Sequence, residues 1–142
     1  MSSTAQAPKS DTASTLNGLR VLLVEDSWII AQSYAGLLEP LGVSVLGPAA
    51  NLSDAARLFA ENEIDAALVD INLQGEQAYD LIDTIHQRGI PVVVVTGYEL
   101  LPRLGDKAFA VLKKPIRAEQ LLRALRSIGG KAHASEVVGA SS

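Results

Sequence analysis

The sequence contains no cysteine, so disulfides and cysteine-bound metals are excluded. It has no apolar run of about 18 residues, which is the length that a membrane-spanning helix needs. The first 17 residues lack the apolar stretch of a secretory signal. No segment is rich in Lys and Arg, and the formal net charge is −4. These absences argue against partners in the membrane or among nucleic acids.

Several motifs that bind nucleotides or carry out acyl transfer are also missing. The chain has neither GxxxxGK[ST] nor GxGxxG, and no serine stands in a GxSxG context. Its two histidines, His86 and His133, fall on an expected helix and in an expected tail. Both are better explained as exposed side chains than as metal ligands.

The length and composition fit one globular domain with two tails. The chain has 142 residues, of which 48% are hydrophobic and 20% charged. Residues 1–17 are rich in Ser, Thr and Ala, and residues 129–142 in Gly, Ser and Ala. We expect a disordered tail over 1–17, a domain over 18–128 and a flexible tail over 129–142.

Apolar runs alternate with helical patterns along the domain. The runs are continuous, which is typical of strands buried on both faces of a parallel sheet. The pattern therefore predicts a doubly wound α/β fold. One crossover, over 97–107, contains Pro and Gly and leaves room only for a short or irregular fourth helix. Strands are expected at 19–24, 43–46, 66–69, 92–95 and 108–112, and helices at 27–39, 51–63, 76–88 and 117–128.

Polar side chains follow four of the five expected strands. Glu25 and Asp26 follow the first, Asp70 the third, Thr96 the fourth, and Lys113 and Lys114 the fifth. In open α/β sheets the carboxyl ends of the strands form the ligand-binding edge, so these side chains are expected to meet there. Carboxylates without Cys or His suit a hard cation, Mg²⁺ or Mn²⁺. A lysine and a hydroxyl opposite that cation suit a phosphoryl group.

Each of these residues also has an ordinary structural explanation. Asp26 could cap the helix that follows it, and Asp70 could begin a turn. Thr96 before Gly97 is a common strand exit, and paired lysines usually lie in solvent. The functional interpretation is favoured because the four strand ends carry complementary chemistry.

The chain resembles the bacterial response-regulator receiver domain over about residues 19–128. The matching segments are VLLVED, LVDIN with Asp70, VVTGY with Thr96, and KKP with Lys114 before Pro115. The resemblance implies a flavodoxin-like fold with strand order 2-1-3-4-5. It also implies a cytoplasmic protein that receives a phosphoryl group from a sensor histidine kinase or a histidine phosphotransfer protein.

The resemblance also implies a role for each matching residue. Asp70 would be the phosphoacceptor, Thr96 would hydrogen-bond the phosphoryl oxygens and Lys114 would pair with them. The Lys114–Pro115 peptide bond is expected to be cis. The ligands of Mg²⁺ (or Mn²⁺) would be Asp26, Asp70, Glu25, which would bind directly or through water, and the backbone carbonyl of Asn72.

The sequence departs from the family pattern at two places. Thr-Gly-Tyr at 96–98 matches a subgroup with Phe-Ala-Thr-Gly-Tyr, but Val94 and Val95 replace Phe-Ala. Most receivers carry an aromatic switch residue three positions before the lysine, where this chain has Val111. We therefore expect the switch to run through the loop 97–107, with Tyr98 as the moving group. The alternative is that Tyr98 merely packs at the edge of the sheet.

No effector domain is recognised after residue 128, which predicts a stand-alone receiver that signals by contacting a downstream protein. Its only catalysis would be its own aspartyl phosphorylation and dephosphorylation, so we do not expect an enzyme. The alternative is a pseudo-receiver that binds partners without phosphorylation. An aspartyl-nucleophile phosphatase would need a DxD motif after the first strand. A flavodoxin-like cofactor binder would need a Ser/Thr/Gly-rich loop where this chain has acids.

Overall fold

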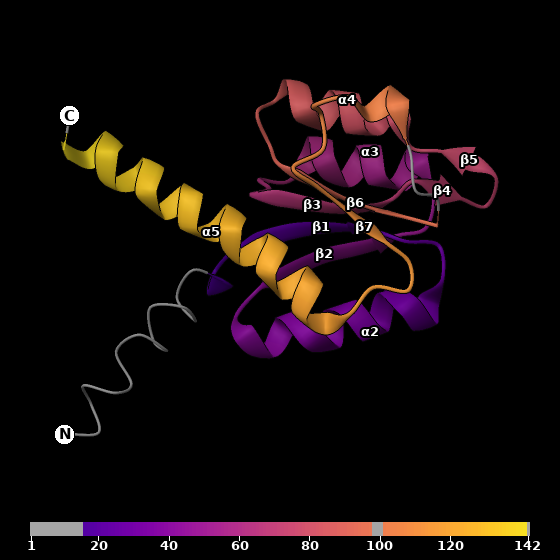
Figure 1. The fold of residues 1–142 in the computed structure, drawn as a ribbon, viewed down its shortest axis with the longest axis horizontal. Coiled ribbons are helices and arrows are strands. Elements are labelled where there is room, and N and C mark those ends of the chain that lie inside the picture. The colour runs from indigo at the N-terminus through magenta and orange to yellow at the C-terminus, as the bar shows by residue number, and fades with distance from the viewer. Residues whose placement is uncertain (1–15, 98–100, 142) are drawn as a thin grey trace.

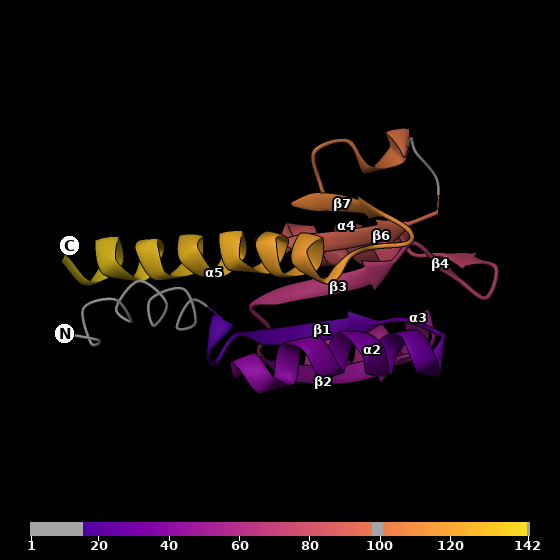
Figure 2. The ribbon, with the colours of Figure 1, turned by 60° about the horizontal axis from the view of Figure 1, so that its bottom comes forward.

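The structure, a computed structural model, describes residues 16–97 and 101–141, and its centre is a five-stranded parallel sheet (Figure 1). The strand order is β2-β1-β3-β6-β7, with β7 at one edge and β2 at the other (Figure 2). Taken in chain order, this is the predicted 2-1-3-4-5 arrangement, which is confirmed. The strands are β1 (Arg20–Val24), β2 (Ser44–Ala49), β3 (Ala66–Asp70), β6 (Val92–Thr96) and β7 (Ala110–Lys113).

Helices cover both faces of the sheet. In Figure 1, α3 (Leu52–Glu61) and α4 (Tyr79–Gln87) lie on one face. On the other face lie α2 (Trp28–Leu38), which is followed by the 3₁₀ turn η1 (Glu39–Leu41), and α5 (Ala118–Ser141). The predicted α/β class is therefore confirmed.

Each central strand sends alternate side chains into two separate cores. On β1, Leu22 and Val24 pack beneath α3 and α4, whereas Val21 and Leu23 pack against α2 and α5. All four are at most 1% exposed. Because both faces are covered, no position on such a strand needs a polar residue, which explains the uninterrupted apolar runs.

The second core begins earlier in the chain than expected. Leu16 is fully buried among its residues, although the sequence placed it in a disordered tail. Its carbonyl accepts the backbone N–H of Leu19 at 3.0 Å. Residues 1–15 of that predicted tail lie outside the described residues.

Strand β2 continues through Gly47-Pro48, where the sequence predicted that it ends. The register with β1 shifts here, since Leu22 pairs with Leu46 but Val24 pairs with Ala49. Gly47 has φ 106°, and a Cβ at this position would lie 2.7 Å from the carbonyl oxygen of Leu23. This bulge lets an edge strand accommodate proline and continue. It brings the Ala49 carbonyl to the N–H of Glu25, at 2.9 Å.

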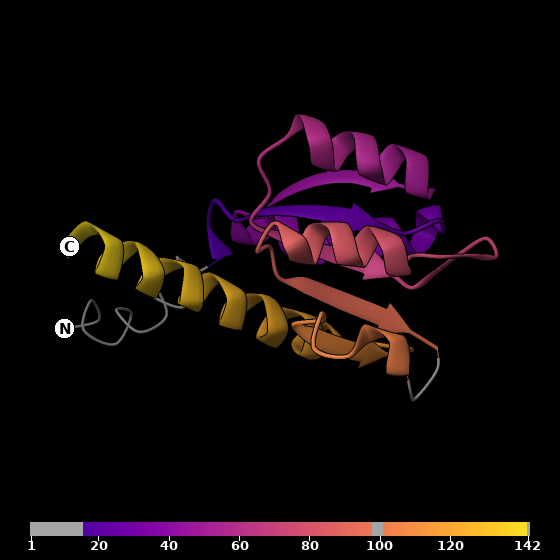
Figure 3. The ribbon, with the colours of Figure 1, turned by 90° about the horizontal axis from the view of Figure 1, so that it is seen from above.

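A short antiparallel hairpin separates β3 from α4. It consists of β4 (Asn72–Leu73) and β5 (Glu76–Gln77), and it projects beyond the carboxyl edge of the sheet (Figures 1 and 3). The predicted helix start at residue 76 is therefore wrong, since α4 begins at Tyr79. Gln74 and Gly75 connect the strands with φ values of 50° and 89°. Positive φ at both central residues is what a two-residue type I′ turn requires.

The β6–β7 connection contains one 3₁₀ turn, η2 (Pro102–Leu104), in its described part, as expected for a short or irregular fourth helix. Two side chains of the connection attach it to α4. The guanidinium of Arg103 lies 4.2 Å from the ring centroid of Tyr79, and Lys107 Nζ lies 2.5 Å from Asp83 Oδ1. In its described part, the connection is therefore held by side-chain contacts with α4 rather than by a helix of its own.

Helix α5 is longer than predicted, because its backbone continues from Ala118 to Ser141 and not to residue 128. The predicted flexible tail thus falls largely within this helix. Glycine disfavours a helix by only about 1 kcal/mol, and no proline is present over 129–142 to end it. The domain boundaries at 18 and 128 stay predictions. Across the part of the chain that the structure describes, no helix has the length and apolar character to cross a bilayer.

Candidate functional site

Three carboxylates gather at the carboxyl edge of the sheet. Glu25 and Asp26 directly follow β1, and Asp70 is the last residue of the adjacent strand β3. One ligand oxygen from each lies within 4.8 Å of the others. Glu25 and Asp70 are buried, whereas Asp26 is partly exposed at the entrance. The structure therefore brings together the acids that the strand pattern placed on a shared edge.

Helix α2 is capped without help from Asp26. The Ser27 hydroxyl accepts the backbone N–H of Ile30 at 3.3 Å, and Ser27 has the extended conformation of an N-cap residue. Its own N–H donates to Glu25 Oε2 at 3.0 Å. The capping explanation for Asp26 is therefore wrong, and its carboxylate belongs to the acidic cluster.

Lys114 brings an ammonium group from the end of β7 to the cluster. Its Nζ lies 2.6 Å from Asp70 Oδ2, while the Lys113 side chain is exposed. The N–H of Lys114 donates to the carbonyl of Thr96 at 2.7 Å, and Thr96 is fully buried at the end of β6. The Lys114–Pro115 peptide bond is cis, as expected.

Asn72 also contacts the cluster through its backbone. Its N–H donates to Asp70 Oδ1 at 3.0 Å. Together with Lys114, it supplies a donor to each oxygen of the Asp70 carboxylate. The role of the Asn72 carbonyl as a metal ligand stays a prediction.

The close packing of the three acids shifts the pKa values of groups in and around the cluster. Burial, followed by the charge of Asp70, raises the pKa of Glu25 to about 7, although the Ser27 N–H opposes the shift. Burial, with Glu25 and Asp70 behind it, raises the pKa of Tyr34 to about 12. Burial lowers the pKa of Lys114, but the hydrogen bond and charge of Asp70 outweigh it, so that this pKa is raised. The three carboxylates of the cluster are therefore only partly compensated by the one ammonium of Lys114.

The donor set fits a hard divalent cation. Glu25 Oε1 is buried and has no hydrogen-bond partner among the described residues, which costs free energy unless a ligand compensates it. Three carboxylates share one ammonium, and oxygen ligands of this kind suit Mg²⁺ or Mn²⁺. Glu25, Asp26 and Asp70 are therefore the residues that would hold such an ion.

The raised pKa of Glu25 predicts a stability that falls as pH rises. The folded protein keeps the proton to about pH 7, whereas the unfolded chain releases it near 4.5. Without metal, the free energy of unfolding should therefore decrease between these values, by roughly 3 kcal/mol. Glu25→Gln should remove this decrease. Urea unfolding in EDTA at several pH values between 4.5 and 8 measures it.

Asp70, Asp26 and Lys114 also face Glu25, so the informative quantity is the difference between variant and wild type. Glu39→Gln, at an exposed position on η1, is the control and should follow the wild type. An identical pH dependence for Glu25→Gln and wild type would contradict the argument.

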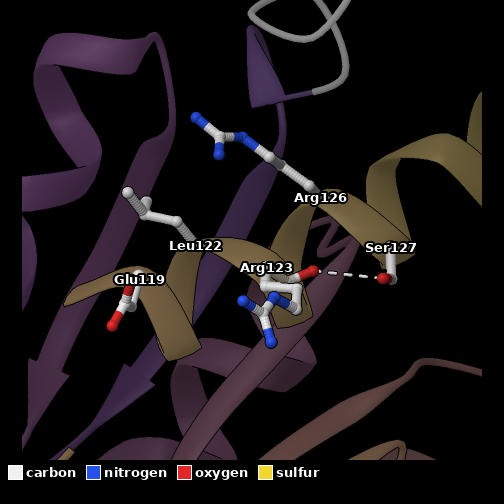
Figure 4. A pocket seen from close by; sticks show the side chains of 5 residues that line it. All are labelled: Glu119, Leu122, Arg123, Arg126 and Ser127. Atoms are coloured by element: carbon white, nitrogen blue, oxygen red, sulfur yellow. Dashed lines mark hydrogen bonds between the residues drawn. The ribbon is translucent and has the colours of Figure 1, made fainter. Parts of the chain in front are cut away.

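A hollow of about 420 Å³ lies on α5, and none of the three acids lines it (Figure 4). The described residues that line it, Glu119, Leu122, Arg123, Arg126 and Ser127, all belong to this one helix. Ser127 donates its hydroxyl to the carbonyl of Arg123 at 3.1 Å. Side chains on one face of a single helix do not converge on a ligand, so we assign no chemistry here.

The sequence reasoning missed two neighbours of the acids. Tyr34 of α2 received no functional prediction, yet after burial it is the charges of Glu25 and Asp70 that raise its pKa. The backbone N–H of Gln74 donates to Asp26 Oδ2 at 2.9 Å. Gly75 after Gln74 was the available signal for a turn, whereas a backbone donor has no signature in the sequence.

The fold and the site together define an α/β domain whose acidic, lysine-paired centre lies at the carboxyl edge of a parallel sheet. A family model described as the response regulator receiver domain matches residues 21–126. The chain belongs to this family, the receiver domains of two-component response regulators.

Curated relatives agree with this assignment. The transcriptional regulatory protein PdtaR of Mycobacterium tuberculosis is 29% identical over 111 residues, which are 75% of this chain and 54% of the relative. The sensor histidine kinase AruS of Pseudomonas aeruginosa is 31% identical over 128 residues, which are 82% of this chain and 13% of the relative. The chain thus corresponds to about half of the first and to a small part of the second.

Solved structures give the same result. A CheY-like response regulator receiver domain protein from Methanospirillum hungatei superposes with a TM-score of 0.75 at 26% identity. The match covers 82% of this chain and 98% of that structure.

Proposed function

We propose that this chain is a receiver that accepts a phosphoryl group on Asp70 in a Mg²⁺-dependent reaction. The donor is a sensor histidine kinase or a histidine phosphotransfer protein, and the output is a contact with another protein. The chain catalyses only its own phosphorylation and dephosphorylation.

The contact between Lys114 and Asp70 carries the proposal. An ammonium 2.6 Å from a buried carboxylate, at the entrance of an acidic cluster, is arranged for an anion that attaches to that carboxylate. In the transfer, an Asp70 oxygen forms a bond to phosphorus while the bond from phosphorus to the donor nitrogen breaks. Lys114 and Thr96 would then hold the phosphoryl oxygens. A bound Mg²⁺ supplies further positive charge at these oxygens.

The surface beside the cluster supports a protein as the phosphodonor. Trp28 and Ile29 are the first residues of α2, shortly after Asp26, and are 67% and 80% exposed. Large apolar side chains that remain in water favour contact with another protein. A donor that docks there would bring its phosphorylated histidine toward the partly exposed side of the site.

Incubation with acetyl phosphate and Mg²⁺ tests the proposal. Intact mass should show one added phosphoryl group, and EDTA should prevent the addition, since the acidic cluster repels the phosphodonor when no cation is bound. Asp26→Asn should raise the Mg²⁺ concentration needed by about tenfold or more. It should also reduce the upward shift of the melting temperature that Mg²⁺ produces.

Asp80→Asn is the matched control, because Asp80 is an exposed aspartate at the start of α4. This variant should behave like wild type in both measurements. If wild-type protein gains no phosphoryl group under any Mg²⁺ concentration, the domain acts as a phosphorylation-independent interaction module instead.

A further inference from the structure

The β4–β5 hairpin delivers two backbone donors to the acidic cluster. The N–H of Asn72 reaches Asp70 Oδ1 at 3.0 Å, and the N–H of Gln74 reaches Asp26 Oδ2 at 2.9 Å. Gln74 and Asp26 are 48 positions apart in the sequence. The hairpin thus links the ends of β1 and β3, which supply the three carboxylates.

The turn that presents the Gln74 N–H has an unfavourable backbone conformation. Gln74 is the only described residue other than glycine with a positive φ, at 50°. This region suits Gly, which has no Cβ to crowd the backbone, and Asn, whose short polar side chain can hydrogen-bond locally, better than Gln. The remaining hairpin residues are exposed apart from Leu73, which is 1% exposed in the core beneath α3 and α4. The hairpin is therefore held to the domain by buried Leu73 and by the hydrogen bonds to Asp26 and Asp70.

We infer that this hairpin is a positioning element of the metal site, in which the Gln74 N–H orients Asp26 for the cation. Asp26 is the least buried of the three acids, so it has the most freedom to turn into solvent. A carboxylate has two oxygens, and one can accept the Gln74 N–H while the other faces the cluster. A ligand that is oriented in advance loses less entropy when the cation binds.

Metal binding is then coupled to the hydrogen bond between the Gln74 N–H and Asp26. If the hairpin with this bond formed binds the cation more tightly, the cation must stabilise that form of the hairpin by the same factor. The coupling gives two independent readouts: the Mg²⁺ affinity of hairpin variants and the amide exchange of Gln74 in the wild type. The inference rests on the proposed function, because it presupposes that the acidic cluster binds Mg²⁺.

Two substitutions at one position separate the donor from the side chain. Gln74→Pro removes the N–H and fixes φ near −65°, which excludes the observed turn. It should weaken Mg²⁺ binding about tenfold, as followed by the thermal shift during titration. Gln74→Gly keeps the N–H and removes the crowding at positive φ, so it should bind Mg²⁺ at least as tightly as wild type.

Melting in EDTA checks that Gln74→Pro retains the folded core. At saturating Mg²⁺ this variant should still gain one phosphoryl group on Asp70. In wild-type protein, saturating Mg²⁺ should slow exchange of the Gln74 amide about tenfold, measured by NMR. This second measurement needs no variant to fold.

Equal Mg²⁺ affinities for Gln74→Pro and wild type, or an exchange rate of the Gln74 amide that Mg²⁺ leaves unchanged, would overturn the inference while the proposed function stands. A wild-type protein that shows no response to Mg²⁺ overturns the inference together with the proposed metal site.

Discussion

Asp70→Asn should abolish phosphorylation completely under conditions in which the wild type gains one phosphoryl group. The amide is nearly the same shape as the carboxylate, but it has no anionic oxygen to attack phosphorus. Intact mass after treatment with acetyl phosphate and Mg²⁺ measures the difference. The effect is all or none because Asp70 is the acid that Lys114 contacts at 2.6 Å.

The variant should fold, since Asn has nearly the shape of Asp and its single amide oxygen can still accept from either the Asn72 N–H or Lys114. Asp80→Asn serves again as the control and should label like wild type. Equal labelling of Asp70→Asn and wild type would show that another group receives the phosphate and would refute the assignment.

Lys114→Met should slow phosphorylation about 100-fold at saturating Mg²⁺. Methionine keeps much of the unbranched stem but removes the charge that stabilises the transferring phosphoryl group, and loss of one such donor typically costs a factor of 100 to 1,000. The initial rate of mass gain with acetyl phosphate measures the effect. The same change removes a positive charge that competes for Asp70, so the Mg²⁺ affinity should rise rather than fall.

Lys113→Met is the matched control, because it deletes the adjacent ammonium, whose side chain is exposed. Its rate should stay within about twofold of wild type. Similar rates for the two lysine variants would contradict the role of Lys114, whereas a strong effect of Lys113→Met alone would exchange the roles.

The part of the site that could be predicted from the sequence is the part made by side chains at strand ends. The interior of a buried parallel strand is apolar, so the first acid after Val24 or Val69 marks the end of the strand. Adjacent parallel strands end at the same edge, so the sequence alone predicts that Glu25, Asp26 and Asp70 lie together. Lys114 was distinguished from Lys113 by the family resemblance alone.

The parts that were missed depend on backbone geometry or on distant packing. Pro48 stays within β2 because Gly47 adopts a positive φ and lies close to the backbone of β1. The residues around Gly47 in the sequence do not indicate this packing. The β4–β5 hairpin uses Gln-Gly, whereas Asn-Gly is the usual signal for its turn. Leu16 is buried because it packs in the core between the sheet and helices α2 and α5, although its neighbours in the sequence are polar. The proposed moving group, Tyr98, lies outside the described residues and stays a prediction.

The 3₁₀ turn η2, in the described part of the connection between β6 and β7, determines how a disturbance at the sheet edge would spread. A crossover helix moves as a rod and carries a shift from one end to the other. Three residues cannot act as a rod, and only Leu104 of η2 is buried in the core beneath α3 and α4. The connection also contacts α4 through the cation–π contact of Arg103 and the partly exposed ion pair of Lys107, each worth about 1 kcal/mol or less. These two contacts open within a few RT. In this domain a signal would therefore change the fraction of molecules in which the β6–β7 connection is attached to α4. A partner that binds the attached form would lose affinity in proportion to the conformational entropy lost on binding.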